Sequence, residues 1–256
     1  MRLMRLELLV SLALLGWCVV GCRGTDVKLH DESIRQYRLG EHYFRDGSYV
    51  KAEDHYKRAL NVDDRNAYAY RRLGMINIAR GYFEQAEDYL RKAVKLDPDE
   101  AAHLDQLGVA LVGRRKYRRA LSTFQKALNK REDYFPSKYH IVGVYRRLKQ
   151  LNKARVQCLQ LLSTYPQKAE PHLEMGLLYL AQGDQHQAKR SFKRAIDRDS
   201  KLIEPHFELA KIYLQLKKYR LCLTHLQKVL SIKTTHSEAR HMFGLARRAY
   251  MASGGR

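Results

Sequence analysis

The chain has 256 residues, of which 45% are hydrophobic and 29% are charged, and its mean hydropathy is −0.53. Five prolines and 15 glycines are too few for a collagen-like or low-complexity chain, so most of the chain should fold as a domain or a repeat array. The net charge of +21 favours nucleic acid, an anionic membrane surface or an acidic protein as a partner.

The first residues have the pattern of an export signal. Arg2 and Arg5 precede an apolar run over residues 8–20, which is broken only by a serine and a glycine. A basic start followed by a short apolar stretch is typical of a secretory signal, and the run is short for a transmembrane helix. We predict a signal peptide over residues 1–21. The alternatives are an uncleaved anchor helix or an ordinary signal with a chance cysteine.

The predicted signal ends in Val19, Val20 and Gly21, and Cys22 follows directly. These residues resemble a bacterial lipobox, whose cysteine is lipidated and becomes the new N-terminus. The resemblance implies a covalent lipid on Cys22, a tether over residues 22–32 and no other cofactor. Arg23 stands where an aspartate retains enterobacterial lipoproteins at the inner membrane. An outer-membrane, periplasm-facing location is therefore implied, and nucleic acid is excluded as a partner.

Four ladders of residues recur every 34 positions without an insertion or deletion. The glycine-rich ladder is Gly40, Gly74, Gly108, Val142, Gly176, Ala210 and Gly244. The others are Ala52, Ala86, Ala120, Ala154, Ala188 and Cys222; Tyr56, Leu90, Phe124, Cys158, Phe192 and Leu226; and Ala59, Ala93, Ala127, Leu161, Ala195 and Val229. Glycine inside a helix costs about 1 kcal/mol relative to alanine. Its recurrence therefore indicates that another helix approaches closely in each copy.

The period and the small residues resemble the tetratricopeptide repeat, a helical hairpin. The resemblance implies an all-α, right-handed superhelical solenoid of six hairpins. We place the repeats at 33–66, 67–100, 101–134, 135–168, 169–202 and 203–236. Residues 237–252 continue the first-helix pattern and predict a capping helix, and residues 253–256 predict a disordered tail. Gly47, Gly81 and Gly183 are expected in the turns inside the hairpins, and repeats four and six depart most from the pattern.

Two cysteines remain after the signal and the lipidated residue are set aside. Cys158 and Cys222 occupy packing positions two repeats apart, too far for a disulfide, which needs Cα atoms within about 7 Å. We predict two buried free thiols. The sequence has no catalytic motif, phosphate loop or zinc-ligand spacing, so we expect a protein that is not an enzyme and binds no metal.

The first helix of each repeat should present a stripe of side chains to a binding groove. The candidate groove residues are Tyr37, Phe44, Tyr68, Arg71, Met75, Ile78, Tyr139, Leu173, Leu177 and Phe207. An apolar, aromatic groove of this kind favours an amphipathic helix or an extended peptide as the ligand. The alternative is that neighbouring repeats bury these residues against one another.

The positive charge is concentrated in the second half of the chain. Residues 135–256 carry 23 basic and 8 acidic residues, a net charge of +15, whereas residues 23–134 carry 23 and 18, a net charge of +5. The candidate basic surface consists of Arg114, Arg115, Lys116, Arg118, Arg119, Arg146, Arg147, Lys189, Arg190, Lys193, Arg194, Lys217 and Lys218. It is either a solvated face or a contact for anionic lipid, lipopolysaccharide phosphates or an acidic partner.

A lipobox followed by six such repeats is similar to the pilotin-like lipoproteins of type IV pilus systems. That resemblance implies a monomeric scaffold that helps the outer-membrane secretin to assemble or localise, and so supports pilus biogenesis and motility. One alternative is a lipoprotein adaptor that docks peptidoglycan hydrolases or periplasmic proteases. Another is a subunit of a different envelope assembly, such as a secretion or gliding machine. Repeat architecture by itself does not decide between these partners.

Overall fold

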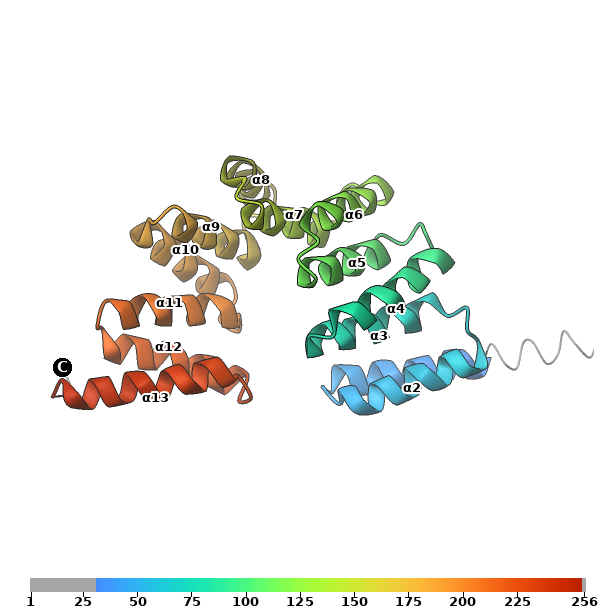
Figure 1. Ribbon diagram of the computed structural model, residues 1–256, viewed down its shortest axis with the longest axis horizontal. Helices are drawn as coiled ribbons and strands as arrows, with labels where there is room; N and C mark the ends of the chain where they lie inside the picture. The colour runs from blue at the N-terminus through green and yellow to red at the C-terminus, as the bar shows by residue number, and fades with distance from the viewer. Residues whose placement is uncertain (1–30, 255–256) are drawn as a thin grey trace, which may run out of the picture. The chain divides into compact units, whose positions relative to one another are not determined.

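The computed structural model describes residues 31–254, in which all regular secondary structure is helical (Figure 1). Residues 31–45 form the first helix. The helices that follow are α2 (Tyr49–Val62), α3 (Ala67–Arg80), α4 (Phe83–Leu96), α5 (Ala101–Gly113), α6 (Tyr117–Lys130), α7 (Phe135–Arg147), α8 (Leu151–Thr164), α9 (Ala169–Ala181), α10 (Gln185–Arg198), α11 (Ile203–Gln215), α12 (Tyr219–Ile232) and α13 (Ser237–Ala252). The predicted all-α fold of helical hairpins with a final single helix is confirmed. The predicted signal peptide and Cys22 lie outside the described residues.

The helices group into two compact units that divide between Tyr134 and Phe135. In the first unit, α2, α3, α4 and α5 each pack on the helix that follows, and α3 also contacts α5. In the second unit, each helix from α7 to α12 packs on the helix that follows, and α7 also contacts α9. Contact within a hairpin and with the adjacent hairpin is the arrangement of a repeat array, in which each hairpin completes the core of the one before it.

The second helix of each repeat buries one narrow stripe. In α2 this stripe is Ala52, Tyr56 and Ala59, which are spaced by four and three residues and fully buried. The same spacing recurs at the same register in α4, α6, α8, α10 and α12. Spacings of four and three residues place these side chains on one face of an α-helix, so a single face of each second helix forms its apolar core contact.

The glycine ladder packs against the large residues of the third ladder. A Cβ atom on Gly108 would lie 2.4 Å from the Phe124 ring, and one on Gly176 would lie 2.5 Å from the Phe192 ring. Both rings are completely buried. A side chain on either glycine would therefore push an aromatic residue out of a filled core, which explains why these helices carry the unfavourable residue.

Repeat four reverses the sizes of this pair. Val142 stands on the glycine ladder and Cys158 stands where other repeats have a large residue, and both are completely buried in one cluster. The larger residue on one helix thus accompanies the smaller residue on the other, so the total volume is kept. The divergence of this repeat does not disturb the hairpin, because α7 and α8 pack directly on each other.

The turns inside the hairpins need a left-handed residue. Gly47, Gly81 and Gly183 have φ angles of 75°, 82° and 82°, as expected from the sequence. The same register position is filled by Arg115, Lys149 and Lys217, with φ angles of 58°, 59° and 56°. Non-glycine residues are uncommon in this region of backbone space, so these three turns are set by the hairpin packing and not by the residue that occupies them.

The two thiols are free and buried, as predicted. Burial raises the pKa of Cys158 to about 12 and that of Cys222 to about 11. The Cys158 thiol also donates a hydrogen bond to the Pro171 carbonyl at 3.2 Å. Within residues 31–254, no helix combines the length and the apolar character needed to cross a membrane.

Candidate partner-binding surfaces

A row of aromatic rings crosses the first helices of the first three repeats. The Tyr37 and Tyr68 ring centroids are 6.4 Å apart, and the Tyr68 ring meets the His103 ring edge-on at 5.4 Å. We call these three residues the aromatic row. Tyr68 is 44% exposed, whereas His103 is completely buried. The exposed ring of Tyr68 is therefore available to a partner, while its packing on Tyr37 and His103 holds it in place.

Two adjacent arginines beside the aromatic row have opposite environments. Arg72 binds Glu41 with both ends of its guanidinium, through Nε–Oε1 and Nη2–Oε2 contacts of 2.6 and 2.5 Å. Arg71 lies 5.7 Å from the centre of the Tyr68 ring, and its buried Nε has no hydrogen-bond partner. It forms no ion pair with any residue in the described part of the chain. Arg72 is thus committed to the fold, while Arg71 can receive an acidic group from a partner.

Glu41 is the carboxylate that holds Arg72 in place beside the aromatic row. Burial raises the pKa of its carboxyl, but the hydrogen bonds from Arg72 and from the Tyr56 hydroxyl outweigh burial, so the pKa lies below its usual value. The Tyr56 hydroxyl donates to Glu41 at 2.6 Å, and burial together with this bond raises the pKa of Tyr56. Glu41 is therefore charged at neutral pH, and its charge is neutralised by Arg72. This pairing weakens its repulsion of an acidic ligand.

His103 makes the first unit sensitive to acid. Burial, followed by the nearby Arg71 cation, lowers the pKa of His103 to about 4. Because an unfolded histidine has a pKa of about 6.5, the unfolded state binds the proton first. The stabilisation that comes from keeping His103 neutral is therefore present above pH 6.5. The free energy of unfolding should fall by about 2 kcal/mol between pH 7 and pH 5. Urea denaturation at both pH values measures the loss, and the His103→Gln variant should show a smaller dependence on pH. An equal loss of stability between pH 7 and pH 5 in that variant would show that His103 does not cause the acid sensitivity.

The other candidate groove residues divide by unit. In the first unit, Phe44, Met75 and Ile78 are half-buried. The Arg72 guanidinium lies 4.9 Å from the centre of the Phe44 ring, and Ile78 packs against the buried core. These three residues are therefore less open to a partner than Tyr68.

In the second unit, two predicted groove residues are part of the core. Leu173 and Phe207 are only 5% and 6% exposed and lie in one large cluster, while Leu177 and Tyr139 are half-buried. The expectation that Leu173 and Phe207 line an open groove is wrong, because neighbouring helices of the second unit cover them. The alternative derived from the sequence, burial between repeats, holds at these two positions.

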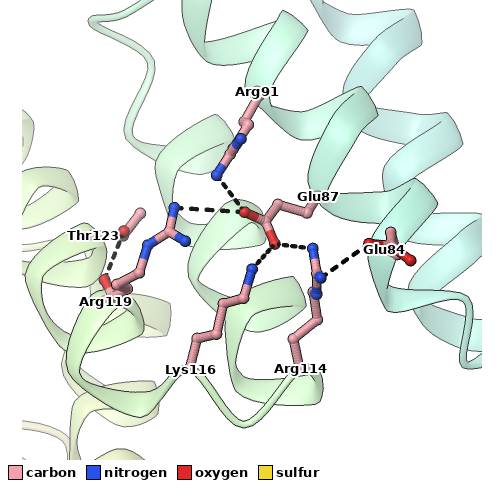
Figure 2. Close-up of polar contacts among 7 residues, drawn as sticks. All are labelled: Glu84, Glu87, Arg91, Arg114, Lys116, Arg119 and Thr123. Atoms are coloured by element: carbon pink, nitrogen blue, oxygen red, sulfur yellow. Dashed lines mark hydrogen bonds and ion pairs between the residues drawn. The ribbon is translucent and has the colours of Figure 1, made fainter.

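Four of the cations near the α5–α6 turn surround one buried carboxylate (Figure 2). Glu87 of α4 is 1% exposed, and its oxygens contact Arg91, Arg114, Lys116 and Arg119 at 2.5, 2.8, 3.1 and 3.5 Å. Burial raises the pKa of Glu87, but the contacts with Lys116, Arg114 and Arg91 outweigh burial, so the pKa lies below its usual value. Arg114, Lys116 and Arg119 thus join repeats two and three in addition to giving the surface its charge.

The same ion pairs occur one repeat earlier. Glu53 contacts Lys57 and Arg80, which occupy the positions 34 residues before Glu87, Arg91 and Arg114. Neither set was predicted from the sequence, although opposite charges that recur at the repeat spacing are a signal for such ion pairs. The third copy is absent because the position after Glu87 in this register is Leu121.

The basic residues of the second unit are mostly unpaired. Arg146 binds Glu174 at 3.0 Å, and Arg147 donates to the Gly143 carbonyl at 3.2 Å. Of the salt bridges in the described residues, none involves the remaining candidates of this unit, which are Lys189, Arg190, Lys193, Arg194, Lys217 and Lys218. In the first unit, Arg115 and Arg118 are exposed. The second unit therefore presents cations whose charge is not neutralised by its own carboxylates.

No group of three or more His, Cys, Asp or Glu side chains in residues 31–254 is arranged to hold a metal ion. Models of the tetratricopeptide repeat match residues 32–99, 169–202 and 203–236 of the chain. The last two ranges coincide with the fifth and sixth repeats placed from the sequence.

Known proteins share this architecture. Human Superkiller complex protein 3 is 30% identical over 95 residues, which is 35% of this chain and 6% of that protein. The crystal structure of PilW, described as a widely conserved type IV pilus biogenesis factor, has a TM-score of 0.64 at 20% identity and covers 82% of this chain and 97% of its own. PilF of Pseudomonas aeruginosa has a TM-score of 0.55 at 22% identity, over 75% and 86%. Likeness at these identities establishes the fold alone.

Proposed function

The chain belongs to the tetratricopeptide-repeat family of protein-interaction scaffolds, and on this premise we propose that it is a lipid-anchored outer-membrane protein that assists the type IV pilus secretin to assemble or localise. The observation that carries this proposal is the aromatic row beside the unpaired Arg71. The likeness to PilW and PilF, together with the lipobox-like end of the signal at Cys22, supports the pilus setting.

The first unit supplies what a peptide ligand needs. An apolar or aromatic side chain of the secretin would lie on the open face of Tyr68, and an acidic side chain beside it would pair with Arg71. The neighbouring Arg72 and Glu41 neutralise each other, so they hold the groove in shape without competing for the ligand. The expected ligand is therefore a short segment that carries an apolar and an acidic residue close together.

Deleting the gene should remove secretin multimers from non-reducing gels while secretin monomer remains. The full-length gene should restore the multimers, and a gene carrying Tyr68→Ala with Arg71→Gln should restore few of them. Tyr82→Ala is the matched control, because Tyr82 is 55% exposed but lies in the α3–α4 turn and outside the groove. Unchanged multimers in the deletion strain would overturn the proposal. Capture of peptidoglycan hydrolases or a periplasmic protease in place of secretin would favour the adaptor function.

The lipid anchor has its own test. Cys22→Ala should shift the protein from the membrane fraction to the soluble periplasmic fraction, because the acyl chains would be missing. Fractionation of cells followed by immunoblotting measures the shift. A protein that stays with the membrane after this substitution would show that a partner or the basic surface attaches it instead.

A further inference from the structure

A hollow in the second unit lies where repeat four meets repeat five. It has a volume of about 550 Å³ and is lined by Leu162 at the end of α8, Pro166 in the following turn, His172 in the first turn of α9, and Arg194, Asp197 and Arg198 near the end of α10. Two guanidinium groups and an imidazole thus share one open recess that has an apolar wall.

The two arginines are not satisfied by the protein. Arg194 forms no ion pair with any residue between 31 and 254, and Arg198 donates only to the neutral Gln167 side chain, at 2.7 Å. Asp197 also lines the recess, yet no salt bridge joins it to either arginine. The first unit differs, since its Arg114 is held by the buried Glu87 carboxylate and its Arg80 by the half-buried Glu53 carboxylate.

The pKa of His172 is affected by the positive charges in the recess. Burial lowers its pKa most, a hydrogen bond with the Pro166 backbone raises it, and the charges of Arg194 and Arg198 lower it again, so the pKa lies below its usual value. The imidazole is therefore neutral at pH 7 and provides a hydrogen-bonding group beside two positive charges. This combination suits an oxyanion with several acceptor atoms, because guanidinium groups bind phosphate through paired hydrogen bonds.

We infer that the recess formed by His172, Arg194 and Arg198 binds a phosphate group. The apolar Leu162 and Pro166 would contact the organic part of a phosphate ester. Lys189, Arg190 and Lys193 lie on the same helix, α10, and would raise the local concentration of anions. A lipid headgroup at the membrane surface and free phosphate present the same chemistry. The site is independent of the proposed secretin partner, so either idea can fail without the other.

The next repeat contains a related recess that serves as an internal control. It is lined by His206 and Lys228, which lie 34 residues after His172 and Arg194, and its volume is about 380 Å³. There the second arginine is replaced by Ile232, and the Nδ1 atom of His206 is already occupied by Nδ1 of His225 at 2.9 Å. We expect this recess to bind phosphate poorly.

Titration of the histidine ring signals by NMR tests the inference, with the full chain in neutral, nonionic micelles. Inorganic phosphate should raise the pKa of His172 by about half a unit or more relative to sodium chloride at the same ionic strength. Assignment comes from the signal that is lost in His172→Gln. The shift should disappear in the Arg194→Gln/Arg198→Gln variant, persist in Lys228→Gln and grow in Asp197→Asn.

A second arm replaces inorganic phosphate with phosphatidic acid in the micelles and compares it with an uncharged detergent alone. A shift in both arms means that lipid can supply the phosphate group, and a shift in one arm identifies the source. No shift in either arm overturns the inference, as does a shift that survives in the double arginine variant. Equal thermal unfolding of the variants and the parent chain shows that the fold is intact.

Discussion

Replacing Gly108 with alanine should lower the free energy of unfolding of the first unit by about 3 kcal/mol. The new Cβ would lie 2.4 Å from the ring of Phe124 in α6, which is completely buried, so the ring or the helix would have to shift. Alanine is the better helix former by about 1 kcal/mol, so the measured loss is what remains after that gain. Urea denaturation followed by circular dichroism measures it, and hydrogen exchange locates it in the first unit.

Gly244 provides the matched control, since it occupies the same ladder in α13. No atom lies within 4 Å of the position that its Cβ would take. Gly244→Ala should therefore be neutral or stabilise the chain by up to about 1 kcal/mol, through helix propensity alone. The same chemical change is thus expected to have opposite signs at two copies of one repeat position. A destabilised Gly244→Ala protein, or an unaffected Gly108→Ala protein, would contradict the packing described above.

Replacing Glu87 with glutamine should cost about 3 kcal/mol, the range found when one partner of a buried ion pair is removed. Glutamine keeps the shape of the side chain but leaves four cations around a neutral group. The pKa of Glu87 is lowered in the folded state, so its contribution is present above the unfolded pKa of about 4.3 and is lost as the pH falls through the folded value. The difference between parent and variant should therefore be full at pH 7 and shrink in strong acid.

Glu53→Gln is the appropriate comparison for this variant. Glu53 has the same register and pairs with Lys57 and Arg80, but it is 19% exposed and surrounded by fewer cations. We expect a cost of about 1 kcal/mol or less, because water can replace part of the lost interaction. Equal costs at the two positions would mean that the burial of Glu87 and its extra cations add nothing to stability.

The repeat architecture could be predicted from the sequence because it depends on local spacing. The ladders that contain Gly108 and Phe124 mark two helices that must touch, and the structure places these residues in contact. The reversal at Val142 and Cys158 is visible in the same ladders, although only the structure shows that both residues fill one cluster. Small and large residues at a fixed period thus contain most of the information about the hairpins.

The surfaces were harder to predict, because exposure depends on contacts between repeats. Leu173 and Tyr68 both lie on first helices, yet Leu173 is buried in the second unit and Tyr68 is open in the first. Both belong to the same predicted stripe of the first helices, so periodicity alone does not separate them. The burial of Glu87 could not be predicted for a related reason. A single glutamate in a charged segment resembles a surface residue, and only the structure shows that Arg114 and Lys116 of the α5–α6 turn contact it.

The labelling of Cys158 and Cys222 can measure local opening of the second unit. Both thiols are sealed in the core of separate repeats, and their raised pKa values leave almost no thiolate in the folded state. An alkylating reagent can therefore react only when the surrounding helices separate. The rates of labelling at the two sites, resolved by mass spectrometry, give the opening free energies of repeats four and six in the unmutated chain. A difference between them would show whether the array opens from its end or from its interior.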